Sequence, residues 1–277
     1  MIGLSIAKFY SALGYSVVVL EKESRAGEGI SSRNSGVIHG GMYYPANSLK
    51  TKFCIEGNKM LYKYAKLKNI SHQKLGKYII ASQDSDLGKL DKIYEQGISN
   101  GAIIKRCSKD EMQAEYPDLI LTGGIYSSET GIIDVPELIS ALEGDIQRNS
   151  GTVAFNTSFK SATKADNLFE IVCDDGNEFV VQAKNLVNAA GLTSDISSKN
   201  IKQLDNKYNH PIYFAKGHYF KYSGSHPFNS LVYPLSDEFS LGIHVGFDVS
   251  GQLRFGPDLT WVQSLDFSFD EALKENF

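Results

Sequence analysis

The sequence predicts an α/β fold with two domains, the first of them discontinuous. Short unbroken apolar runs at 16–20 and 186–190 are typical of buried strands in a parallel sheet. After about residue 205 the pattern becomes mostly strand, which favours an antiparallel sheet. A chain of 277 residues is long enough for about two domains. We therefore expect a βαβ domain over 1–70 and 135–204, and an inserted, largely antiparallel domain over 71–134 and 205–277.

The individual elements follow from hydrophobic periodicity and from turn signals. Gly14 ends the first helix in the usual C-terminal position. Ser108 with Glu111 forms a capping-box pattern, and Asp174–Asn177 is a hairpin signal. The expected helices are 4–13, 49–68, 87–101, 108–117 and 134–149; the expected strands are 16–20, 75–81, 168–173, 178–182, 186–190, 212–222, 230–233, 241–247 and 252–255.

Composition excludes several classes of protein. The net charge is -4 and lysine and arginine are scattered, which argues against nucleic-acid binding. The three cysteines, Cys54, Cys107 and Cys173, are far apart and odd in number, which indicates a reducing compartment and no metal site. The sequence shows neither a membrane span nor a signal peptide. We expect a cytoplasmic protein.

Half of a dinucleotide-binding motif stands at the start of the chain. Gly3 occupies the place of the third glycine of a G-x-G-x-x-G fingerprint, and Glu21 follows 18 positions later at the end of a strand. Such an acid accepts hydrogen bonds from ribose hydroxyls. The first strand of a Rossmann-like unit and the first two glycines are absent. The alternatives are that Glu21 is a solvated acid at a strand end, or that it binds the ribose of a nicotinamide cofactor.

A second segment, residues 31–44, combines small polar residues with a histidine and two tyrosines. Gly36, Gly40 and Gly41 allow the backbone to lie close against a flat ligand. The alternative is a glycine-rich loop whose His39 and tyrosines only pack against neighbours.

Together these motifs resemble the L-2-hydroxyglutarate dehydrogenase/oxidase branch of the FAD-dependent D-amino-acid-oxidase (DAO) superfamily. The likeness runs in order along essentially the whole chain. It is carried by 33–44, Leu49-Lys50, Phe53-Cys54, Gly57-Asn58, Gly76-Lys77, 130–134, 188–192, 216–220, 231–234, 241–245 and 254–258. The family begins with a strand and a full glycine fingerprint, and it continues well past Phe277. The resemblance therefore implies a chain truncated at both ends, by a mispredicted start, a split gene or trimming.

The resemblance implies FAD as the cofactor. Glu21 would bind the ribose, and Lys22 would lie at the adenine end. The polar run 32–35 would line the pyrophosphate and the ribityl chain. His39 and Gly40 would lie near the isoalloxazine ring. The full set of implied cofactor residues is Gly3, Glu21, Lys22, Ser32, Arg33, Asn34, Ser35, His39, Gly40, Phe159 and Gly191.

The resemblance also implies a 2-hydroxy acid as substrate, with hydride passing from C2 to flavin N5. A neutral histidine suits the base, and His39 and His244 are the candidates. Cations and hydroxyls hold carboxylates, and an arginine does so in bidentate fashion. The candidates for substrate binding are Tyr44, Lys216, Tyr233 and Arg254. From the pattern alone, each is equally an ordinary strand or surface residue, and His244 in its apolar run is equally a packed core residue.

Three alternatives stay open at this stage. The chain is a non-catalytic remnant, since a deleted first strand would leave its neighbours' buried backbone groups unpaired. The fold is kept but the substrate is an amine or amino acid. The cofactor is a nicotinamide. The electron acceptor under the resemblance is a quinone or oxygen, and peripheral association with the inner face of a membrane is compatible with it.

Overall fold

The computed structural model describes residues 1–235 and 242–277. The chain forms two compact units. Unit 1 comprises Met1–Asn34 and Val135–Tyr213, and unit 2 comprises Ser35–Asp134 and Phe214–Phe277. The compact units differ from the predicted domains at 35–70 and at 205–213. Residues after 34 belong to unit 2 because strand β2 (Val37–Ile38) pairs with its strand β7 (Gly131–Ile133).

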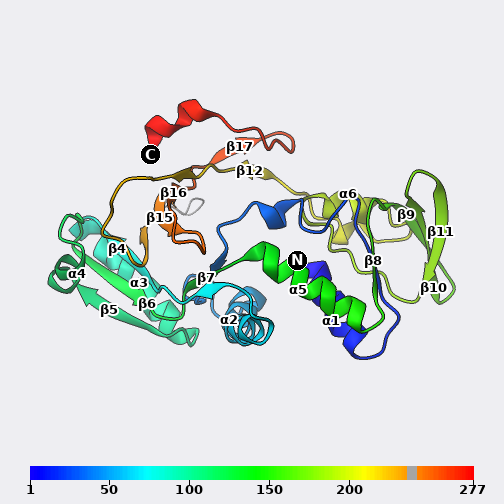
Figure 1. Cartoon of the computed structure of the whole chain (residues 1–277), viewed down its shortest axis with the longest axis horizontal. Helices are drawn as coiled ribbons and strands as arrows, with labels where there is room; N and C mark the ends of the chain where they lie inside the picture. Colours follow the sequence, from blue (N-terminus) through cyan, green and yellow to red (C-terminus); the bar gives the residue numbers. More distant parts are fainter. Residues whose placement is uncertain (236–241) are drawn as a thin grey trace. The chain divides into compact units, whose positions relative to one another are not determined.

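Unit 1 combines helices with two small sheets. Helices α1 (Ile2–Ala12) and α5 (Val135–Arg148) lie side by side (Figure 1). Strand β1 (Val18–Leu20) pairs in parallel with β8 (Thr152–Ala154). A second sheet has the order β11-β10-β9, all antiparallel, from β9 (Ser158–Ala165), β10 (Leu168–Asp174) and β11 (Glu178–Ala183). This confirms the predicted hairpin. Helix α6 (Ser194–Lys199) follows.

Two predictions for unit 1 are wrong. Residues 186–190 form no strand, and Val187 is 54% exposed. Val18, expected to be buried on both faces of a sheet, is 53% exposed. The physical reason is the same in both places. Among the described residues β1 pairs only with β8 and nothing pairs with 186–190, so no wide parallel sheet buries these apolar runs.

Unit 2 is built on a seven-stranded mixed sheet of order β13-β16-β15-β14-β4-β6-β5. Only the β14–β4 pair is parallel. The strands are β4 (Lys77–Ala81), β5 (Ile104–Ser108), β6 (Gly123–Ser127), β13 (Phe220–Lys221), β14 (Leu231–Pro234), β15 (His244–Phe247) and β16 (Leu253–Gly256). The strand predicted over 212–222 is interrupted, with β12 (Phe214–Lys216) pairing instead with β17 (Thr260–Val262). Leu241, predicted to begin a strand, lies outside the described residues.

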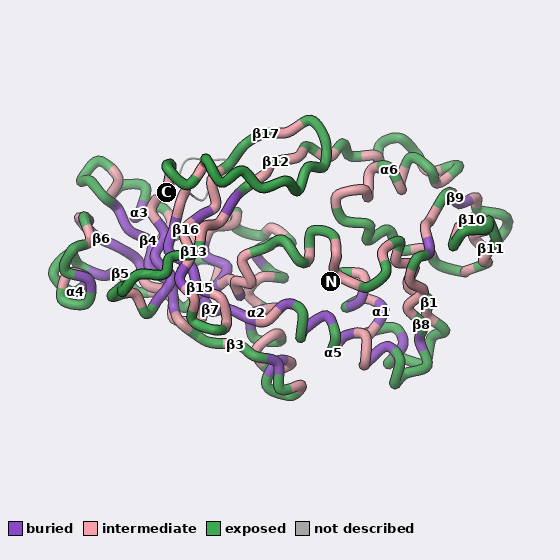
Figure 2. Tube along the Cα trace, turned by 45° about the horizontal axis from the view of Figure 1, so that its top comes forward, coloured by how far each residue is buried: buried purple, intermediate pink, exposed green. Residues whose placement is uncertain are grey.

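Helices α3 (Leu87–Ser99) and α4 (Lys109–Glu115) pack against this sheet. Unit 2 also contains α2 (Leu49–Lys68), η5 (Glu271–Asn276) and β3 (His72–Gln73), which pairs with β7. The helices predicted from periodicity are therefore confirmed. One face of the sheet buries a cluster around Tyr116 and Val232, and the other buries Met42, Ile79 and Ile125. Figure 2 shows the buried segments gathered at β4, β6, β15 and β16.

The capping box at the start of α4 is formed as predicted. The Glu111 backbone N–H donates to Ser108 Oγ at 3.2 Å, and the Ser108 N–H donates to Glu111 Oε2 at 2.7 Å. We expect Ser108→Ala to lower the free energy of unfolding by about 1 kcal/mol, because the helix loses its N-terminal acceptor. Urea denaturation measures this loss. Ser99→Ala, at an exposed position in α3, is the control and should change stability by less than half as much; equal losses would contradict the role of the cap.

Candidate functional site

One face of the seven-stranded sheet carries several of the candidate substrate residues. In the parallel pair β4–β14, Lys77 lies opposite Leu231, so Tyr233, two residues later, points to the same face as Lys77. His244 lies across from Tyr233 on the neighbouring strand β15. The two rings stack, with centroids 3.6 Å apart and planes at 22°. The sheet register thus places Lys77, Tyr233 and His244 side by side.

Arg254 continues this row on β16. It lies opposite Gly246, and His244, two residues before Gly246, shares its face of the sheet. The guanidinium carbon of Arg254 is 5.2 Å from the centroid of the Tyr219 ring. The Tyr219 hydroxyl in turn lies 3.4 Å from His244 Nε2. We call these five residues (Lys77, Tyr233, His244, Tyr219 and Arg254) the polar row.

The glycine-rich segment packs tightly in unit 2 and fixes His39. A Cβ added at Gly40 would lie 2.6 Å from Ser127 Oγ of β6, so only glycine allows this approach. The buried Asn58 of α2 donates from Nδ2 to the His39 carbonyl at 3.0 Å and to the Glu129 carbonyl at 2.9 Å. Its amide therefore ties the loop and α2 together.

His244 is oriented as a neutral base. Its Nδ1 lies 2.9 Å from the Gly242 carbonyl, which can only accept a hydrogen bond, so the proton belongs on Nδ1 and the lone pair on Nε2. The pKa of His244 is lowered to about 4. Burial is the main cause, the hydrogen bond to the Gly242 carbonyl opposes it, and the charges of Lys77 and Arg254 add to the lowering. Near neutral pH its Nε2 is therefore unprotonated, and its lone pair accepts from the Tyr219 hydroxyl at 3.4 Å.

His39 is also neutral, and one of its ring nitrogens has no partner. Its Nδ1 is buried and has no hydrogen-bond partner among the described atoms. Burial lowers its pKa to about 3, and the charges of Lys77, Lys50 and His244 lower it as well. His39 therefore lies within electrostatic range of the polar row, and its buried Nδ1 has no hydrogen-bond partner among the described atoms.

Lys77 is a cation without a carboxylate. The residue is 1% exposed, and its Nζ lies 4.5 Å from the Tyr43 ring centroid and 4.7 Å from that of Tyr233. No aspartate or glutamate of the described chain forms an ion pair with it. Burying an ammonium costs several kcal/mol, whereas a cation–π contact returns about 0.5–2 kcal/mol. Burial accordingly lowers the pKa of Lys77 to about 7.

Two other predicted substrate residues are placed less favourably. Lys216 Nζ forms an ion pair with Asp266 Oδ2 at 2.8 Å and donates to Ser268 Oγ at 2.9 Å. Its charge is therefore compensated. Tyr44 is partly buried, and the Lys50 Nζ lies 4.3 Å from its ring centroid. The polar row contains neither residue.

Unit 1 gathers the predicted adenosine-binding residues around the start of α1. The Met1 amine donates to Ser31 Oγ at 3.2 Å, and a Cβ added at Gly3 would lie 3.2 Å from the Ala189 side chain. Burial lowers the pKa of the Met1 amine, whereas the charge of Glu21 raises it. Glu21 therefore lies within electrostatic range of the helix start.

One of the two oxygens of the Glu21 carboxylate has a hydrogen-bond partner. Its Oε1 accepts from the Glu23 N–H at 3.1 Å, and its Oε2 has no hydrogen-bond partner among the described residues. The Glu21 carbonyl accepts from the Thr157 N–H at 2.9 Å, two residues before the predicted cofactor residue Phe159. One oxygen of Glu21 is thus without a hydrogen-bond partner in the described part of the chain.

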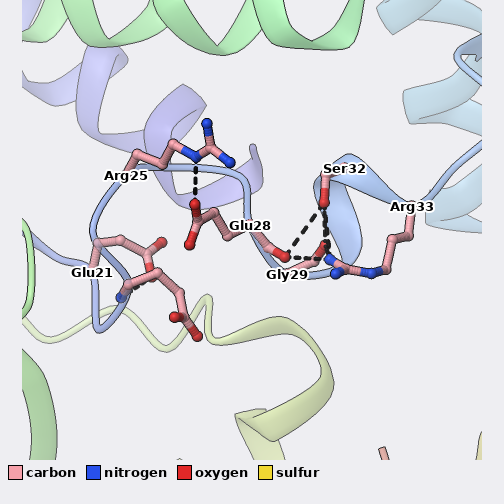
Figure 3. A network of polar contacts seen from close by, with 7 residues as sticks. Glu21, Arg25, Glu28, Gly29, Ser32 and Arg33 are labelled. Carbon is pink, nitrogen blue, oxygen red and sulfur yellow. Dashed lines mark hydrogen bonds and ion pairs between the residues drawn. The ribbon is translucent and has the colours of Figure 1, made fainter. Parts of the chain in front are cut away.

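The polar run after Glu21 is held by hydrogen bonds from its side chains to nearby backbone carbonyls (Figure 3). The Arg33 guanidinium donates to the Gly29 carbonyl at 3.1 Å and to the Glu28 carbonyl. Ser32 Oγ donates to the Gly29 carbonyl at 3.0 Å, and Asn34 donates to a carbonyl three residues earlier at 2.6 Å. These side chains shape the turn η1 (Ile30–Ser32) in addition to any ligand contact.

The remaining predicted cofactor residues have ordinary partners. Lys22 is exposed and pairs with Glu23 at 3.4 Å. Phe159 packs in the core of the antiparallel sheet of unit 1. Gly191 has a φ of +60°, which favours glycine. The Ser35 carbonyl accepts from the Arg254 guanidinium.

Sequence reasoning missed three features of unit 2. Lys77 and Tyr219 belong to the polar row, although neither was a candidate. His218, 6% exposed, has its Nδ1 3.0 Å from Asp258 Oδ1, and its buried Nε2 has no partner among the described atoms. A lysine directly before the apolar run 78–81 was the available signal for Lys77.

In the described chain no cluster of histidine, cysteine or acidic residues suits a metal ion. Among the described helices, none combines the length and the apolar character of a membrane span.

The chain is similar to known flavin-dependent oxidoreductases. The model of the family described as "FAD dependent oxidoreductase" (DAO) matches residues 1–276. The mitochondrial L-2-hydroxyglutarate dehydrogenase of Arabidopsis thaliana is 33% identical over 297 residues, covering 96% of this chain and 62% of that protein. The L-2-hydroxyglutarate dehydrogenase of Escherichia coli K12 is 27% identical, covering 93% and 62%.

Solved structures agree at the level of the fold. L-α-glycerophosphate oxidase from Mycoplasma pneumoniae with FAD bound superposes with a TM-score of 0.83 at 22% identity, covering 94% of this chain and 70% of that chain. Glycine oxidase from Geobacillus kaustophilus gives a TM-score of 0.81 at 16% identity, covering 98% and 72%. The expected α/β fold class is confirmed.

The chain belongs to the DAO family of FAD-dependent oxidoreductases. The resemblance to L-2-hydroxyglutarate dehydrogenases found in the sequence is also confirmed. The chain spans about 62% of the length of these two relatives.

Proposed function

We propose that the protein oxidises a 2-hydroxy acid resembling L-2-hydroxyglutarate with FAD as the oxidant. The observation that carries this proposal is the polar row of unit 2. It places a neutral, oriented histidine between two cations that have no carboxylate partner in the described chain. A hydroxy acid offers the complementary groups, namely a hydroxyl proton for the histidine and a carboxylate for a cation.

The residues present suit FAD. In unit 1 the free Oε2 of Glu21 and the start of α1 match the ribose and phosphate requirements of a dinucleotide. In unit 2 the buried Nδ1 of His39 has no hydrogen-bond partner in the described chain, and a bound cofactor could supply one. When bound, FAD supplies the acceptor for the hydride that leaves C2 of the substrate.

The chain's own residues supply the other parts of the reaction. Arg254 Nε, buried and without a partner in the described chain, binds the C1 carboxylate. His244 Nε2 accepts the hydroxyl proton as C2 is oxidised. A bound carboxylate offsets the charges of Lys77 and Arg254, and this raises the pKa of His244 toward the working range of a base. The buried surroundings of His39 and Tyr233 keep water away from the reacting carbon.

The same proposal includes reoxidation of the reduced flavin by a quinone or by oxygen. It also includes a cytoplasmic location with peripheral contact to a membrane. Both points are supported by the sequence likeness alone. Stopped-flow reoxidation of the reduced protein with each acceptor decides between the two acceptors. A faster reaction with quinone would favour a dehydrogenase, and a faster reaction with oxygen an oxidase.

A substrate panel tests the proposed reaction class. The protein is incubated with FAD and a dye acceptor, and rates are compared for L-2-hydroxyglutarate, L-lactate, L-glutamate and glycine. We expect turnover with the hydroxy acids and none with the amino acids. Turnover with glycine or glutamate alone would instead support an amino-acid oxidase; one of the similar structures is a glycine oxidase.

A further inference from the structure

The five residues of the polar row differ in how much of each reaches the surface. Lys77 is 1% exposed, and Tyr233 and His244, whose rings stack on each other, are each 2% exposed. Tyr219 and Arg254 are half-buried. A molecule that approaches the row from solvent therefore meets Tyr219 and Arg254, whereas His244 offers it almost no surface.

Both ring nitrogens of His244 already have partners within the chain. Its Nδ1 lies 2.9 Å from the Gly242 carbonyl, and its Nε2 lies 3.4 Å from the Tyr219 hydroxyl. A neutral imidazole has one lone pair in the plane of its ring, and the Tyr219 hydroxyl donates to it. A substrate hydroxyl cannot donate to the same lone pair while Tyr219 does so. The hydroxyl of Tyr219 thus occupies the direct route to His244.

The hydroxyl of Tyr219 has the properties that passing a proton requires. A tyrosine hydroxyl donates one hydrogen bond and also accepts, so it can accept from a substrate hydroxyl while it donates to Nε2. Burial raises the pKa of Tyr219, and the charge of Arg254 and a hydrogen bond with Ser35 only partly oppose this. Tyr219 therefore keeps its proton near neutral pH.

The position of Arg254 beside Tyr219 matches the order of groups in a 2-hydroxy acid. The guanidinium carbon of Arg254 lies 5.2 Å from the centroid of the Tyr219 ring. Its Nη2 donates to the Phe247 carbonyl at 3.1 Å and to the Ser35 carbonyl, so the backbone fixes the guanidinium there. The carboxylate and the hydroxyl of a 2-hydroxy acid are on adjacent carbons, so the groups that bind them must be neighbours. Arg254 and Tyr219 are such neighbours.

We propose that Tyr219 contacts the substrate hydroxyl and relays its proton to His244. The substrate O–H bond breaks and its proton goes to Tyr219 Oη, while the proton of Tyr219 goes to His244 Nε2. Tyr219 ends the step as a neutral hydroxyl, and His244 ends it as an imidazolium. The hydride leaves C2 for FAD, the oxidant of the proposed reaction. This inference rests on the proposed function, and it makes Tyr219 the residue that touches the substrate in front of His244.

Nitrogen NMR of the histidine-labelled chain tests the contact without any redox step. The Nε2 signal of His244 is assigned by its loss in His244→Asn. Tyr219→Phe keeps the ring and removes the hydroxyl, so we expect this signal to move to higher chemical shift, where an unbonded lone pair resonates. The matched control is Tyr222→Phe, at an exposed tyrosine of the same unit, and it should leave the signal in place. An unchanged signal in Tyr219→Phe would overturn the inference.

The rate of flavin reduction tests the relay itself. Anaerobic stopped-flow absorbance with L-2-hydroxyglutarate compares Tyr219→Phe, His244→Asn and the double variant. We expect Tyr219→Phe to slow reduction by about 10²-fold or more and Tyr222→Phe to leave it unchanged. Because the two residues of a relay act as one unit, the double variant should reduce within about threefold of the slower single variant. Multiplied losses would show independent roles and would overturn the relay.

A second measurement covers the case in which Tyr219→Phe fails to fold. In the unaltered chain two protons move in one step, so the reduction rate should follow a curve against the D₂O fraction of the solvent. A straight line would indicate one moving proton and would overturn the relay while the proposed function stands. An unaltered chain that L-2-hydroxyglutarate does not reduce would instead refute the proposed function, and the relay with it.

Discussion

Replacement of His244 by asparagine is expected to slow reduction of the bound flavin by L-2-hydroxyglutarate by about 10²–10⁴-fold, the usual worth of a general base. Asparagine can keep the bond to the Gly242 carbonyl through Nδ2, because this atom occupies a place similar to that of Nδ1. It has no counterpart to Nε2. The substitution therefore removes the proton acceptor and disturbs the packing on Tyr233 as little as possible.

The measurement is anaerobic stopped-flow absorbance with L-2-hydroxyglutarate. His226→Asn is the matched control, since His226 is an exposed histidine of the same unit and should leave the rate unchanged. The pH profile adds a check. His244 is neutral above its pKa of about 4, so the rate at saturating substrate should fall on the acid side, and at a higher pH once the substrate carboxylates offset the cations. A rate within threefold of the unaltered protein would contradict the assignment.

The second large effect concerns stability. Ile125 on β6 is fully buried in the cluster with Met42 and Ile79, beneath the segment that carries His39. Ile125→Ala should lower the free energy of unfolding by about 2–5 kcal/mol, because it removes three carbons and leaves a cavity. Ile120, 81% exposed, supplies the control, and Ile120→Ala should cost less than about 0.5 kcal/mol. Both are measured by urea denaturation, and similar losses would show that this cluster is not a core.

Local signals in the sequence predicted most elements of the fold. Gly14 ends α1 with a φ of +83°, and the Ser108–Glu111 capping box begins α4, because such signals act over a few residues. The failure at 186–190 has a non-local cause. An apolar run becomes a buried strand only when another strand pairs with it, and local periodicity carries no information about partners.

The same distinction applies to the candidate site. His39, Tyr233, His244 and Arg254 were found because they stand within the motifs that carry the family resemblance. Lys77 was missed as a site residue, because its meaning depends on the pairing of β4 with β14, whose residues are more than 150 positions apart in the sequence. Lys216 was an equally reasonable cation from the sequence, and only the structure shows its pairing with Asp266.

The visible absorption spectrum of the purified chain mixed with FAD shows whether this chain binds the flavin and reduces it. We expect flavin that stays with the protein through gel filtration and that is bleached by L-2-hydroxyglutarate in the absence of oxygen. L-Glutamate, which has an amino group in place of the hydroxyl, should leave the bands unchanged. A protein that emerges colourless, or a bound flavin that L-2-hydroxyglutarate does not bleach, would overturn the proposed function and favour a non-catalytic chain.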